Sequence, residues 1–140
     1  MCTNIRPKLS EKNKYWIEKH RYYELKHFCM QYQSWKRAYA ALDEVSISSS
    51  VLDAVFSNNS EHGDPTGRLA IAKSYYSERI QMVERAAIDA DKILASYILR
   101  AVTEDLSYTY LKSRLEIPCG KDMYYDRYRR FFWLLSKARN

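Results

Sequence analysis

Hydrophobic and polar positions alternate with a helical period through the first third of the chain. Two apolar stripes with a spacing of three to four residues predict two short helices, over about 19–32 and 34–44, with a break near Gln33–Ser34. The first stripe consists of Tyr22, Leu25, Cys29 and Tyr32, and the second of Trp35, Ala38, Tyr39 and Leu42. Residues 1–13 are polar and predict a flexible tail.

Two further periodic segments follow a stretch that is rich in turn-forming residues. Serine, asparagine and glycine dominate residues 46–63, so a loop is expected there. Asp64 and Pro65 form a helix start signal, because aspartate accepts hydrogen bonds from the first amides and proline loses none at the first helical position. The periodicity then predicts helices over about 65–88 and 91–103.

Composition supports a helical fold. The 140 residues include three glycines and three prolines, too few for the many turns of a β-sandwich or barrel. We therefore expect an all-α protein, with a helical platform over 14–105 and a distinct C-terminal segment over 106–140.

The C-terminal segment has the pattern of a helix-turn-helix. Ser107 is suited to cap a short helix, and Glu116–Gly120 form a tight connection in which Ile117 is the buried aliphatic residue. A second helix is expected over 121–137. A short helix, a turn of three or four residues and a second helix form the motif that places its second helix in the DNA major groove.

The second helix of this motif has a predicted core face and a predicted DNA-binding surface. The core face consists of Tyr124, Tyr128, Phe131 and Leu135, spaced for one side of a helix. The predicted DNA-binding residues are Lys121, Tyr125, Arg127, Arg129 and Arg130. Arginine can donate two hydrogen bonds to guanine, and lysine can contact a phosphate. The alternative is that Arg127 and Arg130 pair with Asp126 or lie in solvent.

Charge is distributed unevenly along the chain. The net charge is +6, and residues 106–140 alone carry eight basic against three acidic residues. Residues 46–105 carry six basic against nine acidic residues. A basic end beside an acidic middle is typical of a local anion-binding surface.

The same C-terminal segment resembles region 4 of bacterial sigma factors. The matching positions are Leu106, Ser107, Leu111, Leu115, Ile117, Pro118 and Gly120. The ending over 119–132, rich in tyrosine and arginine with paired phenylalanines, is more similar to the RinA and ArpU type of phage and prophage late-gene regulators. This resemblance covers about thirty residues. It implies a transcription regulator encoded by a mobile element. Lys112 and Asp122 depart from the sigma-factor pattern. Sigma factors have a small alanine at the position of Lys112 and an apolar residue at the position of Asp122.

Several other classes of function are not indicated. The sequence has no P-loop, zinc-protease or serine-hydrolase motif, so we expect a protein that is not an enzyme and has no cofactor. His20, Glu24 and His27 share a helix face but have no fourth metal ligand, and we expect no metal. The N-terminus lacks an apolar signal segment and no apolar run is long enough to cross a membrane, so the cytoplasm is the expected location.

Double-stranded DNA is the expected partner, with RNA polymerase and a second copy of the chain as further expected partners. The rival hypothesis is a non-enzymatic protein-interaction or small-terminase-like packaging subunit. The aromatic segment over 15–39 has two interpretations, a packed core or a surface for self-association or another partner. The three cysteines, Cys2, Cys29 and Cys119, are odd in number and predict no disulfide framework.

Overall fold

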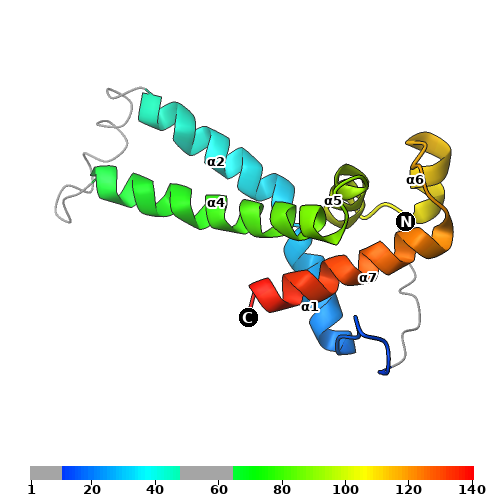
Figure 1. Ribbon diagram of the computed structural model, residues 1–140. Coiled ribbons are helices and arrows are strands. Elements are labelled where there is room, and N and C mark those ends of the chain that lie inside the picture. The colour runs from blue at the N-terminus through cyan, green and yellow to red at the C-terminus, as the bar shows by residue number, and fades with distance from the viewer. Residues whose placement is uncertain (1–10, 48–64) are drawn as a thin grey trace. The chain divides into compact units, whose positions relative to one another are not determined.

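The computed structural model describes residues 11–47 and 65–140, and its regular secondary structure within these ranges is entirely α-helical (Figure 1). The predicted all-α fold is therefore confirmed. The described helices are α1 (Lys19–Cys29), α2 (Tyr32–Ile47), α4 (Pro65–Ala90), α5 (Ala95–Glu104), α6 (Tyr108–Arg114) and α7 (Lys121–Ala138).

The helix boundaries differ from the sequence prediction at several places, and α2 extends to Ile47, so residues 46 and 47 are helical where a loop was predicted. The first break lies at Met30 and Gln31, where Met30 N–H still donates to the Lys26 carbonyl and the chain then turns into α2. No glycine or proline marks this junction, so it carries no local stop signal that could be recognised in the sequence. The helix predicted from residue 91 begins at Ala95 instead. The predicted loop over 46–63, apart from residues 46 and 47, and the capping residue Asp64 lie outside the described residues.

The chain divides into two compact units. One unit contains the described residues up to Tyr32 together with Met82–Asn140, and the other contains the described residues between Gln33 and Gln81. The C-terminal segment 106–140 thus belongs to the same unit as α1, the end of α4 and α5. The reason is visible in the contacts of α7, which packs against both α1 and α5.

An aromatic cluster joins α1 to α7 within the first unit. The hydroxyl groups of Tyr22 and Tyr128 are hydrogen-bonded at 2.7 Å, and the Tyr22 and Phe132 rings meet edge to face with centroids 5.0 Å apart. Leu25 and Cys29 of α1 are fully buried beside this cluster. Aromatic pairs of this geometry add to the free energy of area burial. Much of the aromatic N-terminal segment is therefore core, as one of its two interpretations predicted.

The second unit is a pair of antiparallel helices formed by α2 and the first part of α4 (Figure 1). Lys73 Nζ lies 2.9 Å from Asp43 Oδ1 and 5.4 Å from the centre of the Tyr39 ring, which ties the two helices together. Among the described residues of this unit, Trp35 and Leu69 alone are buried hydrophobic side chains. The described part of the hairpin therefore has a thin apolar core of its own.

Candidate nucleic-acid interface

The first helix of the predicted motif, α6, begins as expected. Ser107 is its N-cap, and the Ser107 hydroxyl accepts a hydrogen bond from Tyr110 N–H at 3.2 Å. Leu111 is fully buried and anchors the helix to the core. Capping and one buried leucine together hold a helix of only seven residues, which is too short to be stable alone.

The connection between α6 and α7 contains one buried side chain, Ile117, and one residue with a left-handed backbone conformation, Glu116. It runs from Leu115 to Gly120, one residue more than the predicted connection Glu116–Gly120 and longer than the three- or four-residue turn of the helix-turn-helix pattern. Glu116 has a φ of 54°, and the turn it creates lets Ile117 N–H donate to the Leu111 carbonyl at 3.1 Å. The Ile117 side chain is buried as predicted. The hydrogen bond and the buried side chain of Ile117 together hold the connection to the end of α6 and to the core.

The N-terminus of α7 is open. Gly120 is its N-cap and contributes no side-chain hydrogen bond, and a Cβ atom built on Gly120 would meet no atom within 4 Å among the described residues. Lys121, Asp122 and Met123 are exposed. The first amides of α7 are thus accessible to a ligand, and these amides carry the partial positive charge of the helix dipole.

The buried face of α7 agrees with the sequence prediction. Tyr124, Tyr128, Phe131 and Leu135 are buried, and Phe132 joins them. The Tyr108 hydroxyl donates to the Cys119 carbonyl at 2.8 Å, and the Tyr108 and Tyr124 rings lie 5.5 Å apart. These contacts hold the start of α7 against α6.

Three of the five predicted DNA-binding residues lie along one ridge of α7. Lys121, Tyr125 and Arg129 are spaced four residues apart, which places them on one side of the helix. Lys121 is exposed, while Tyr125 and Arg129 are partly buried. Burial raises the pKa of the Tyr125 hydroxyl and the charge of Arg129 opposes this shift, so Tyr125 is protonated at neutral pH.

Arg127 points to a different partner. Its Nε donates to Asp91 Oδ2 at 2.9 Å, and one terminal nitrogen donates to Asp126 Oδ2 at 2.5 Å. Burial disfavours the Asp91 carboxylate, but hydrogen bonds from Leu94 N–H, from Arg127 and from Ile93 N–H outweigh it and lower the pKa of Asp91. The ion pair with Asp126 was the alternative interpretation of Arg127, and the structure contains it.

Arg130 follows Arg127 by three residues on α7, so it lies about one helical turn further along and outside the ridge formed by Lys121, Tyr125 and Arg129. It is partly buried, and its Nε, like that of Arg129, is buried without a hydrogen-bond partner among the described residues.

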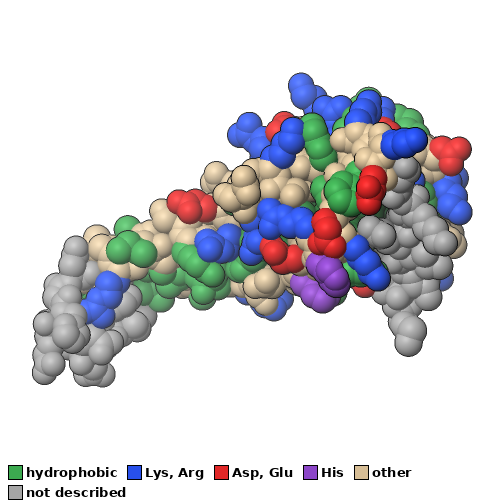
Figure 2. Space-filling view, turned by 90° about the horizontal axis from the view of Figure 1, so that it is seen from below, with side chains coloured by type: hydrophobic (Ala, Val, Ile, Leu, Met, Phe, Trp, Pro, Cys, Tyr) green, Lys and Arg blue, Asp and Glu red, His purple; other side chains and the backbone are tan. Residues whose placement is uncertain are grey.

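Sequence reasoning missed two exposed cations, Lys112 and Arg114, on the last turn of α6. Both precede the turn that leads to Lys121, so the three charges follow one another along the chain. Charge counting alone would have included them, because both belong to the basic segment 106–140. On the face shown in Figure 2, Lys and Arg side chains are interspersed with Asp and Glu.

Within residues 11–47 and 65–140, no three His, Cys, Asp or Glu side chains are grouped in a way that would hold a metal ion. Glu24, the middle residue of the set considered from the sequence, contacts Arg21 and Arg139. Burial raises the pKa of the Cys29 thiol far above neutrality, so this thiol is protonated. None of the described helices is long and apolar enough to span a membrane.

Comparison with known proteins gives no relative: no family model, no curated protein and no solved structure matches this chain.

Proposed function

We propose that this protein is a sequence-specific, double-stranded DNA-binding transcriptional regulator of phage or mobile-element origin, and that α6 and α7 form its helix-turn-helix. The observation that carries the proposal is the arrangement of the turn. Ile117 is buried in the connection between α6 and α7, Lys112 and Arg114 are exposed on α6, and Lys121 is exposed at the start of α7, whose N-cap Gly120 supplies no side-chain hydrogen bond. In helix-turn-helix proteins, the N-terminal residues of the second helix contact base edges.

The proposed contacts follow from burial and charge. Lys112, Arg114 and Lys121 contact phosphates, and a further phosphate meets the uncapped amides of α7. Tyr125 and Arg129 extend the contact along the ridge that begins at Lys121. Arg130 remains a proposed phosphate contact.

Arg127 has a different role in this proposal. Asp91 and Asp126 already bind its guanidinium group. Arg127 therefore positions α7 against the start of α5, and it reads DNA only if both carboxylates release it.

RNA polymerase and a second copy of the chain remain proposed partners. A dimer suits DNA binding because two-fold related helix-turn-helix motifs can bind two half-sites. The second candidate function is a non-enzymatic protein-interaction or packaging subunit. It is favoured by the exposed apolar side chains Ile71 and Tyr75 on the α4 surface.

A pair of substitutions at Gly120 tests the DNA-binding proposal without removing any packed atom. Gly120→Asp and Gly120→Asn both supply good N-cap side chains into space that is open among the described residues, so both variants should fold at least as stably as the original chain. Only aspartate adds a negative charge where the phosphate would lie. Fluorescence anisotropy with labelled duplexes from the genomic neighbourhood of this gene should show about tenfold weaker binding for Gly120→Asp.

The asparagine variant is the matched control and should bind DNA like the original protein. Binding by the original chain should also weaken steeply with salt, linearly in the logarithm of its concentration. Absence of duplex binding at low salt would refute the proposal, and so would equal affinity of the Asp and Asn variants.

A further inference from the structure

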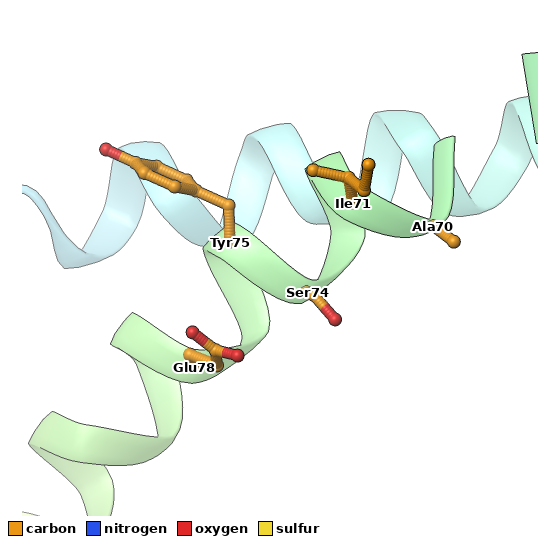
Figure 3. A pocket seen from close by; sticks show the side chains of 5 residues that line it. All are labelled: Ala70, Ile71, Ser74, Tyr75 and Glu78. Carbon is orange, nitrogen blue, oxygen red and sulfur yellow. The ribbon is translucent and has the colours of Figure 1, made fainter. Parts of the chain in front are cut away.

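The outer face of α4 in the second unit carries apolar side chains that are not covered by the described residues. Ile71 is 72% exposed and Tyr75 is 47% exposed. They line a shallow hollow together with Ala70, Ser74 and Glu78, and all five side chains come from α4 (Figure 3). Large apolar side chains that lie together on a surface mark an interaction site.

This face has the spacing of a helix–helix seam. Arg68, Ile71, Tyr75 and Glu78 follow one another at intervals of three, four and three residues. That alternation keeps side chains on one side of a helix and is the pattern through which two helices pack along each other. The two inner positions of this seam are apolar and the two outer positions carry opposite charges.

The seam is complementary to itself in one orientation. If two copies of α4 lie antiparallel with a two-fold axis that crosses the seam at the level of residue 73, each seam residue meets the one equally far from position 73 on the partner. Ile71 then lies opposite the partner's Tyr75, and Arg68 lies opposite the partner's Glu78. A parallel arrangement would instead place Arg68 against its own copy and Glu78 against its own copy, which repels.

Tyr75 is held in place for such a contact. The Arg79 guanidinium lies over the Tyr75 ring, 3.5 Å from its centroid, and donates to the Tyr75 carbonyl at 3.0 Å. A ring that is already fixed loses less conformational entropy when a partner packs on it. Arg79 also covers one side of the ring, which leaves the exposed remainder for the partner.

We propose that a second copy of this chain docks on the α4 seam formed by Arg68, Ile71, Tyr75 and Glu78, in an antiparallel two-fold arrangement. The contact buries two Ile71–Tyr75 layers between two Arg68–Glu78 ion pairs. It is isologous, as most homodimer contacts are. In this contact each copy covers the apolar surface that the other copy leaves exposed on its α4 seam. This proposal specifies the dimer named under the proposed function and does not require DNA binding.

Sedimentation velocity of the full chain, without DNA and over a range of concentrations, tests the contact. A concentration-dependent dimer is expected. Ile71→Glu should weaken it by about tenfold or more, because each copy then places a charge against tyrosine. Ile93→Glu is the matched control, since Ile93 is 79% exposed and lies outside the seam. It should leave the dimer unchanged.

Charge exchange tests the register. Arg68→Glu and Glu78→Arg should each weaken the dimer, because each places like charges opposite one another. The double variant R68E/E78R should restore it, since the pairs are re-formed with the charges exchanged. A protein that is monomeric at every concentration would overturn the proposal, as would equal effects of Ile71→Glu and Ile93→Glu or failure of the double variant to recover. None of these outcomes depends on DNA affinity.

Discussion

Arg127 binds Asp91, a residue that precedes it by 36 positions, through a hydrogen bond of 2.9 Å between Nε and Oδ2. The other carboxylate oxygen of Asp91 accepts from Ile93 N–H and Leu94 N–H at 2.9 and 3.0 Å. One carboxylate therefore caps the turn before α5 and anchors the middle of α7. Arg127, one of the predicted DNA-binding residues, thereby acquires a structural role.

Removing this carboxylate should destabilise the first unit. Asp91→Ala deletes two amide acceptors and one ion pair, so the free energy of unfolding in urea should fall by about 2–3 kcal/mol. Asp91→Asn keeps an acceptor for the amides and should lose less. If the alanine and asparagine variants lose the same amount, the ion pair with Arg127 contributes most of the stabilisation. If the alanine variant is as stable as the original chain, the anchoring role is wrong.

The same residue predicts a pH dependence. The pKa of Asp91 is lowered from the ordinary value of 3.8 in the folded protein, so its contribution is fully present above about pH 4. This contribution is lost as the pH falls through the lowered pKa, because the folded state then takes up the proton that the unfolded state already holds. The stability difference between the original protein and Asp91→Asn should accordingly shrink with acidification. A difference that grows below pH 4 would contradict this assignment.

Replacement by glycine should change stability differently at the two residues that have a left-handed backbone conformation. Glu116 has a φ of 54° and Asp105 a φ of 57°, a region that costs side-chain-bearing residues energy. Glu116→Gly should stabilise the protein by about 0.5–1 kcal/mol. Asp105→Gly gains the same relief but loses the ion pair with Lys26, whose Nζ lies 3.4 Å from Asp105 Oδ1. Thermal unfolding of both variants should therefore rank Glu116→Gly above Asp105→Gly.

Removal of two buried tyrosine hydroxyl groups should change the stability of the protein in opposite directions. The Tyr128 hydroxyl is bonded to that of Tyr22, whereas the Tyr124 hydroxyl is buried without a partner among the described residues. Tyr128→Phe should destabilise the protein by about 1 kcal/mol, while Tyr124→Phe should be neutral or stabilising because it removes an uncompensated polar group. Urea denaturation measures both. A larger loss for Tyr124→Phe than for Tyr128→Phe would show that the Tyr124 hydroxyl has a bonding role.

The DNA-binding proposal predicts that substitution of the exposed cations lowers DNA affinity, whereas substitution of Arg127 lowers stability. Lys112→Ala, Arg114→Ala and Lys121→Ala should each weaken duplex binding and reduce the salt slope by about one, as expected for one phosphate contact each. Their unfolding curves should stay unchanged because all three side chains are exposed. Arg127→Ala should lower stability without reducing the salt slope. A reduced salt slope for a folded Arg127→Ala variant would return this residue to the DNA contact.

The buried face of α7 could be predicted from the sequence, whereas the contact of Arg127 with Asp91 could not. The sequence predicted this buried face because Tyr124, Tyr128, Phe131 and Leu135 repeat with the helical period, and this period survives in any helix that packs on a core. It also predicted Ile117 as the buried residue of the turn. It could not predict that Arg127 is bound by Asp91, because a contact across 36 residues leaves no periodic trace.

By itself, the sequence determined the helical class, the approximate extent of most described helices and the residues with which α7 enters the core. These properties depend on interactions within a few residues, namely helical periodicity, capping and the scarcity of glycine and proline. The tertiary structure alone decided the break at Met30–Gln31, the partner of Arg127 and the apolar face that α4 leaves exposed. Each of these depends on which distant segments pack together, because packing selects the side chains that are buried and those that stay available to a partner.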